Sequence, residues 1–265
     1  MARLLMAKLS SLGLPVRSVS WRDQMRTETR PNVGAALREL WVESWRLMFL
    51  GHATRIPPTF EQFEGEGWED KLKNLDLPSN SPAGLLASAW LDFAGQTLIQ
   101  HEVIGPACNR GTWIIEESFG LKLMLKELLT ARALGGDAQL RAEVDSALEG
   151  LREMFRHRMP DVGVVVSGPV ELAYRWRTAE AGGTGSLEDL GAAGRKGWIG
   201  FETLQTECDR FFRDLTASSG WLLFEIEDAP AEENFARLND RLRTLPACRI
   251  LEERRASDEG EVQHG

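Results

Sequence analysis

The sequence predicts an α/β fold in which short parallel strands alternate with helices. Three observations carry this prediction. Apolar residues recur with helical spacing over long segments, among them 1–12 and 33–50. Apolar runs such as DVGVVV at 161–166 and WLLFEIE at 221–227 separate the later helices and are typical of buried strands. Finally, the run WII at 113–115 ends in two acids, and the carboxyl ends of strands are where open parallel sheets bind ligands.

Composition limits what such a protein can do. With 265 residues, 43% of them hydrophobic, the chain can build a substantial core. The net charge of −9 argues against nucleic acid as the main partner, because phosphate backbones require clustered positive charge. The opening segment carries Arg3 and Lys8 within its apolar pattern, so we expect neither a membrane span nor a secretory signal. Three separated cysteines without metal-ligand spacing indicate reduced thiols in the cytoplasm and no zinc site.

The first half of the chain predicts three helices and a strand. Residues 1–12 place four leucines on one helical face, and after the stop at Gly13 the stretch LPVRSVSW is typical of a short strand. A second helix is expected over 33–50. Residues 51–82 are rich in proline, glycine and acids, which favours an irregular excursion used as a lid or a partner surface. A long helix from 83 to 106 follows, and its apolar part at 83–100 would allow two copies to form a homodimer.

The second half repeats the alternation. Glycines separate most of its elements, and the segment AEAGGTGSLEDLGAAGRKG is predicted to be mobile. The tail at 251–265 has little apolar content and is predicted to be disordered, which leaves one domain over 1–250. The expected elements in this half are a strand ending at Glu116, helices at 119–134 and 138–158, a strand at 161–166, a helix from Pro169, a helix at 201–215, a strand at 221–227 and a helix at 231–245.

Three motifs in this order carry a resemblance to a known family. VIGPAC at 103–108 precedes a glycine and a strand, Glu116-Glu117-Ser118 follows that strand, and PDV and SGPVELAYR occur within 160–175. In pattern and order the chain resembles thymidylate kinases and, more distantly, deoxynucleoside kinases, which belong to the P-loop kinase superfamily. Their motif VI-x-PAL-x-x-G leads into a strand that ends in Asp-Arg-Tyr or Glu-Arg-Ser, and an arginine-bearing lid follows later.

The resemblance implies both a fold and an activity. The implied fold is a three-layer doubly wound parallel sheet of P-loop kinase type, lacking or truncated at its first strand, with an insertion at 51–82 and a lid-like segment at 177–200. The implied activity is phosphoryl transfer from ATP, with Mg²⁺, to a nucleoside monophosphate such as dTMP. The alternative is a catalytically inactive protein of the same fold that acts as a nucleotide sensor or a protein-interaction module.

The resemblance also nominates site residues. Glu116 would hold magnesium or receive a proton from the acceptor, and Arg175 and Arg177 would clamp the transferring phosphoryl group. The other expected roles are substrate binding by Arg22, Gln96, Glu117 and Ser118, and ATP binding in the lid by Arg195 and Lys196. Ordinary roles stay open beside these: two acids can simply begin a solvated loop, and Arg175 and Arg177 have the spacing for helix ion pairs with Glu171 and Glu180.

The chain departs from the family in several places. G-x-x-x-x-G-K-[ST], whose amides cradle phosphates, is absent from the sequence, and MARLLMAKLSSLGLPV resembles the helix that follows that loop. Either the start codon lies further upstream or the first strand is missing; we favour the former, since losing a central strand exposes sheet edges. Glu117 stands where the family has arginine, and Gly95 and Gln96 stand where it has an Asp-Arg pair that contacts the monophosphate. Gln96 can still hydrogen-bond a base edge.

Overall fold

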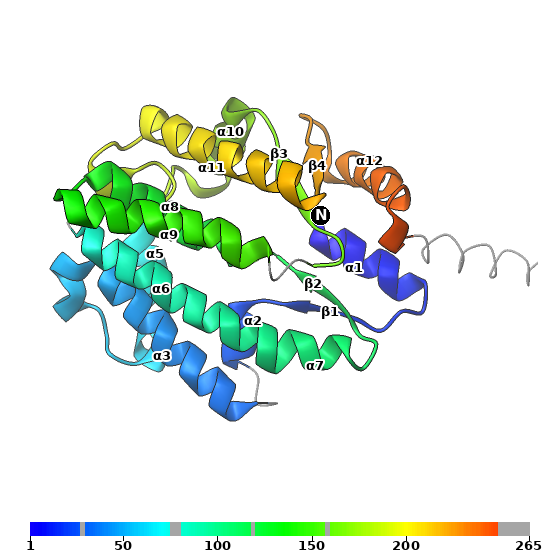
Figure 1. The fold of residues 1–265 in the computed structure, drawn as a ribbon, viewed down its shortest axis with the longest axis horizontal. Coiled ribbons are helices and arrows are strands. Elements are labelled where there is room, and N and C mark those ends of the chain that lie inside the picture. Colours follow the sequence, from blue (N-terminus) through cyan, green and yellow to red (C-terminus); the bar gives the residue numbers. More distant parts are fainter. Residues whose placement is uncertain (27–29, 75–80, 118–119, 157–159, 249–265) are drawn as a thin grey trace, which may run out of the picture.

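Helices dominate the structure, a computed structural model that describes residues 1–26, 30–74, 81–117, 120–156 and 160–248 (Figure 1). The α-helices are α1 (Ala2–Ser11), α2 (Trp21–Arg26), α3 (Pro31–Met48), α4 (Phe60–Gly65), α5 (Trp68–Asn74), α6 (Pro82–Leu98), α7 (Gly105–Cys108), α8 (Leu121–Leu134), α9 (Ala138–Arg156), α10 (Val170–Ala181), α11 (Trp198–Ser219) and α12 (Ala231–Arg243). Short 3₁₀ segments are η1 (Leu50–Arg55), η3 (Gly191–Ala193) and η4 (Pro246–Cys248), and η2 (Ile99–Ile104) is a π-helix.

The strands form two separate parallel pairs. β1 (Val16–Val19) pairs with β2 (Trp113–Glu116), and β3 (Val164–Ser167) pairs with β4 (Leu222–Glu225). Within the described ranges no strand joins the two pairs. The predicted three-layer doubly wound parallel sheet of P-loop kinase type is therefore wrong. Sequence periodicity indicates each strand separately, whereas a continuous sheet depends on pairing between distant segments. Each strand here is also only four residues long.

The predicted positions of individual elements agree better with the structure. Helices at 1–12, 33–50 and 231–245 correspond to α1, α3 and α12. All four strands overlap the runs that predicted them, and β3 extends one residue beyond its run, to Ser167. The segment 51–82 differs from the expected irregular excursion, because α4 and α5 lie in it and Ile56, Phe63 and Leu72 are buried in the main core. This segment is therefore part of the folded body.

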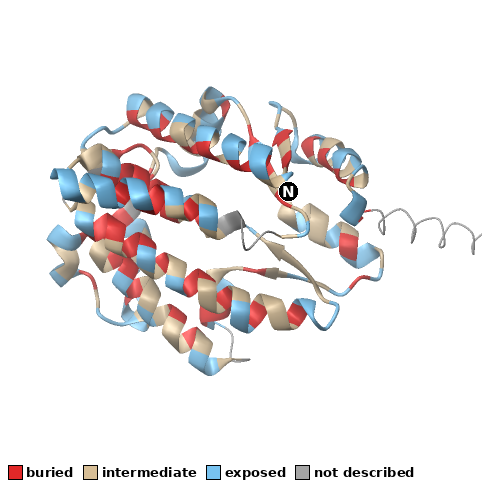
Figure 2. Cartoon of the chain, in the orientation of Figure 1, coloured by how far each residue is buried: buried red, intermediate tan, exposed pale blue. Residues whose placement is uncertain are grey.

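Helix α8 contributes many of the buried residues of the main apolar core. Every residue from Met124 to Ala131 is buried, which is typical of a helix surrounded on all sides (Figure 2). It packs against α6, α9 and α11, and α6 in turn packs against α3. The buried face of α8 includes Lys126, Glu127 and Thr130, so the core also contains polar groups.

A second apolar cluster joins the strand pairs to the terminal helices. Leu9 of α1 and Leu238 of α12 pack with Phe224 of β4, and Trp113 and Ile115 of β2 lie against the same cluster. One core therefore contacts both parallel pairs. Within the ranges that the structure describes, no helix is long and apolar enough to cross a membrane.

Candidate functional site

The carboxyl ends of β1 and β2 bring two predicted site regions together. In the parallel register Val19 lies opposite Glu116, so the residues after β1 lie beside the end of β2. Trp21 and Arg22 begin α2 directly after β1. Glu116, at the end of β2, is therefore placed next to α2, the helix that follows β1.

Glu116 is held by two amides from one helical segment. The Nε2 atom of Gln96 donates to one carboxylate oxygen of Glu116, and the Nε2 atom of Gln100 donates to the other at 2.9 Å. Gln96 lies near the end of α6, and Gln100 lies in the π-helix that continues it. Isolated π-helical turns occur often at functional sites. Glu116 and Gln96, both predicted from the sequence, are thus in direct contact, and Gln100 is the partner that sequence reasoning missed.

Trp21 closes the other side of this arrangement. Its indole Nε1 donates to Oε1 of Gln96 at a long 3.4 Å, and its ring lies 5.8 Å from the ring of Trp41. Gly95 permits this approach, because a Cβ atom there would lie 1.9 Å from the Trp21 ring. The two indole rings, tilted by 47° to each other, lie beside an amide that has both a donor and an acceptor.

Gly120, at the start of α8, likewise leaves space for a neighbouring side chain. It has a φ of +60°, and a Cβ atom would lie 2.7 Å from Oε1 of Gln96. Gly120 is therefore required both for its left-handed backbone and for the space it leaves above Gln96. Gln96 itself is only 3% exposed. The amide is fixed by its surroundings, so a ligand must take the place of one of its present partners.

The Glu116 carboxyl group has an altered acidity. Burial raises its pKa from the ordinary value of 4.5 to about 7, and the hydrogen bonds from Gln96 and Gln100 act in the opposite direction by favouring the charged form. At neutral pH the group can therefore either give or accept a proton. This is the acidity expected of a general acid or base, and also of a carboxyl group that recognises a ligand in its neutral form.

Neither Arg22 nor Glu117 has a hydrogen bond or ion pair to this contact in the described part of the chain. Arg22 forms an ion pair with Glu69 of α5 instead of pointing freely to a ligand. Glu117 is exposed, and Ser118 lies outside the described residues. Only Gln96 and Glu116 of the predicted set are joined by a hydrogen bond in the described structure.

Each of the two predicted catalytic arginines forms an ion pair with a carboxylate. Arg175 lies 2.5 Å from Asp228, a partner 53 residues away that its helical spacing did not indicate. Arg177 lies 2.7 Å from Glu188 and 3.6 Å from Glu180, so the ion pair with Glu180 expected from spacing is present. The structure joins neither arginine to the Gln96–Glu116 contact.

Within the lid-like segment, Arg195 and Lys196 are exposed on the loop before α11. This loop is fastened by Asp189, which is fully buried. Its carboxylate accepts from Thr184 at 2.5 Å, from the amide of Gly191 at 2.9 Å and from the amide of Gly197 at 2.8 Å. The glycine-rich segment, expected to be mobile, thus has a buried anchor that composition alone did not indicate.

Buried titratable groups away from the strand ends were also missed. Asp92 and Glu127 lie in the helical core, where Ser44 donates to Asp92 at 2.9 Å and Ser88 donates to Glu127 at 2.7 Å. Burial raises the pKa of both carboxyl groups, that of Asp92 to about 7. Burial also lowers the pKa of Lys126 to about 8. Their only sequence signal is a charge at a helical position where the pattern requires an apolar side chain.

The implied cofactors do not fit the residues present. Both oxygens of Glu116 already accept hydrogen bonds, and its raised pKa works against Mg²⁺, which binds charged carboxylates. Within the described part of the chain, no three His, Cys, Asp or Glu side chains gather closely enough to hold a metal ion. The sequence also lacks the G-x-x-x-x-G-K-[ST] cradle for ATP.

No protein-family model, curated protein or solved structure matches this chain.

Proposed function

We propose that this protein binds a nucleoside or nucleoside monophosphate at the carboxyl ends of β1 and β2. The single observation that carries the proposal is the contact between Gln96, which the resemblance nominated for substrate binding, and Glu116, which it nominated for catalysis. A carboxamide offers paired donor and acceptor groups that suit the edge of a nucleobase. The resemblance to thymidylate kinases supports a pyrimidine such as that of dTMP.

The aromatic and titratable groups around Gln96 support the same ligand class. The rings of Trp21 and Trp41 offer a surface on which a planar base can stack. The Trp21–Gln96 hydrogen bond is long, so the Gln96 acceptor is the internal partner most easily exchanged for a ligand donor. Glu116, with its pKa of about 7, can then accept from or donate to the same base.

The test is calorimetric titration of the protein with thymidine and with dTMP, without magnesium. We expect saturable binding, and Gln96→Leu should weaken it about tenfold or more, because the base loses a paired hydrogen-bond partner. Gln139→Leu is the matched control, since Gln139 is exposed on α9 and bonds only with Glu143 nearby. Equal affinities for the two variants would refute the proposal, and so would the absence of binding to the unaltered protein.

The binding proposed here corresponds to the nucleotide-sensor alternative, because the residues present do not fit the ATP and Mg²⁺ that phosphoryl transfer requires.

A further inference from the structure

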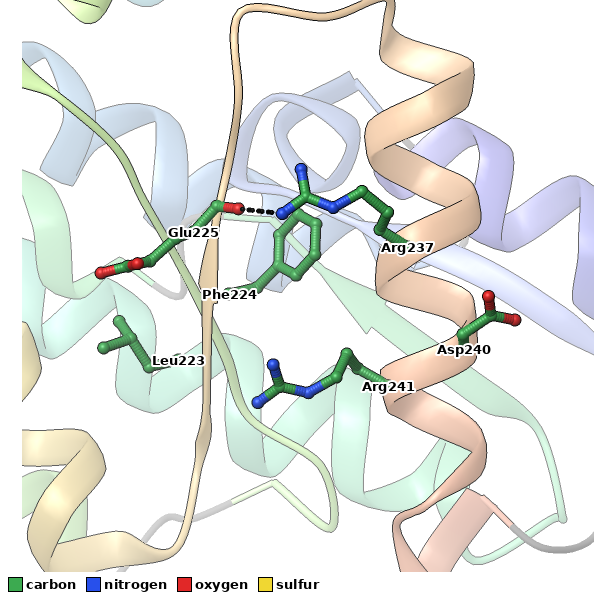
Figure 3. A pocket seen from close by; sticks show the side chains of 6 residues that line it. All are labelled: Leu223, Phe224, Glu225, Arg237, Asp240 and Arg241. Carbon is green, nitrogen blue, oxygen red and sulfur yellow. Dashed lines mark hydrogen bonds between the residues drawn. The ribbon is translucent and has the colours of Figure 1, made fainter.

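A pocket lies between the outer edge of β4 and helix α12, on elements that take no part in the Gln96–Glu116 site (Figure 3). Its volume is about 740 Å³. Sites that hold small molecules range over roughly 300–1,000 Å³, so the pocket is of adequate size. Residues 223–225 form one wall, and Arg237, Asp240 and Arg241 form the other.

The acids of this pocket are directed away from it. Figure 3 shows the carboxylates of Glu225 and Asp240 turned outward from the space between β4 and α12. Each has a cationic partner elsewhere: Glu225 lies 3.1 Å from Arg213 of α11, and Asp240 lies 3.7 Å from Arg243. Their negative charge is therefore balanced outside the pocket.

The arginines are directed into it. The guanidinium groups of Arg237 and Arg241, one helical turn apart, point from α12 toward β4 (Figure 3). The Arg237 guanidinium already has two partners: it lies 2.8 Å from the Glu227 carboxylate and donates to the backbone oxygen of Glu225 at 3.3 Å. For Arg241, no hydrogen bond or ion pair links the guanidinium to any other residue in the described part of the chain. The pocket thus presents an uncompensated positive charge.

The strand edge adds backbone donors. The amides of Leu222 and Ile226 donate to the β3 side. Because backbone groups of successive strand residues point to opposite edges, those of Leu223 and Glu225 lie on the outer edge, where Arg237 already reaches the Glu225 oxygen. The amide of Leu223 consequently faces the same space as the Arg241 guanidinium.

We propose that this pocket binds the phosphate group of a small phosphorylated molecule, with Arg241 as its principal ligand. A phosphate has three oxygens that can accept from a guanidinium fork and from a strand-edge amide together. A carboxylate would satisfy the fork alone. The volume beyond the two arginines then holds the organic part of the ligand.

The experiment is an NMR titration of the ¹⁵N-labelled full chain with inorganic phosphate, and separately with acetate at equal ionic strength. Phosphate should shift the Leu223 amide and the Arg241 Nε–H resonances together along one saturation curve, with an affinity about tenfold or more above that of acetate. Arg241→Gln should weaken phosphate binding about tenfold or more. Arg141→Gln is the control, because Arg141 is an exposed arginine of α9 that does not line the pocket.

Three results would overturn the proposal: shifts that do not saturate, equal responses to phosphate and acetate, or equal losses in the two variants. Since Arg241 is exposed, its replacement should leave the fold intact, which a thermal melt of each variant checks.

Discussion

Two effects act on the pKa of Glu116 in opposite directions. Burial favours its neutral form, and two amide donors favour its charged form. Because its pKa in the folded protein lies near 7, above the ordinary 4.5, the fold holds the proton more tightly than the unfolded chain does. Between about pH 4.5 and 7 the unfolded chain releases that proton first, so this group destabilises the fold as the pH rises.

The pH dependence of stability gives a prediction for Glu116. The contribution of Glu116 to the free energy of unfolding should fall as the pH rises from 5 to 7 and level off above 7. Glu116→Gln should remove this contribution, on the order of 3 kcal/mol. Denaturant unfolding of both proteins at several pH values measures the difference. A difference between the two proteins that does not change with pH would contradict the assigned pKa.

Asp92 and Glu127 act in the same direction and are the background for that measurement. Burial raises the pKa of both, and the charge of Asp92 raises that of Glu127 further. The unaltered protein should therefore lose stability with rising pH even when Glu116 has been replaced. This buried pair contributes to the slope that remains in the Glu116→Gln protein.

Helix α6 depends on a glycine at its contact with Trp21. A Cβ atom at Gly95 would overlap the Trp21 ring, so Gly95→Ala should cost about 2 kcal/mol or more and displace Trp21 from Gln96. Gly150 in α9 is the matched case, because a Cβ atom there meets nothing within 4 Å. Gly150→Ala should stabilise by about 0.5–1 kcal/mol, since alanine is the better helix former. Thermal unfolding of both variants measures the two changes in stability. If both changes had the same sign, this packing of Gly95 against Trp21 would be contradicted.

The loop between α10 and α11 depends on Asp189. Asp189→Asn replaces an acceptor oxygen with a donor, so at least one of the bonds from Thr184, Gly191 and Gly197 is lost. We expect tryptic cleavage after Arg195 and Lys196 to become about tenfold faster. Asp145→Asn, an exposed change on α9, is the control. Equal cleavage rates for the two variants would show that Asp189 does not anchor the loop.

Across the whole molecule, local patterns predicted the four strands and most of the long helices, missed α4 and α5, and failed to predict how the elements assemble. The helices α1, α3 and α12 follow from apolar spacing, because that spacing reflects burial along one helix. Strand pairing depends on contacts between distant segments, as between Val16 and Trp113, and the alternation of elements wrongly indicated one continuous sheet.

In the candidate site too, the sequence predicted individual residues but not most of the contacts that they form. Gln96 and Glu116 were nominated by sequence motifs, and their contact required only that α6 and β2 lie side by side. The partners of Arg22 and Arg175 could not be foreseen, because Glu69 and Asp228 lie 47 and 53 residues away along the chain. Gln100 joins the site through the π-helical segment, for which the sequence carries no recognisable signal.

The central claim is that a nucleobase binds at the Gln96–Glu116 contact, and the most direct measurement is NMR of the side chains concerned. The ¹⁵N-labelled protein would be titrated with thymidine while the carboxamide signals of Gln96 and Gln100 and the indole N–H signal of Trp21 are followed. The account predicts that these three signals shift together and saturate at one concentration, with the exposed Gln139 carboxamide unchanged. Saturable binding that leaves these three signals in place, or no binding at all, would contradict it.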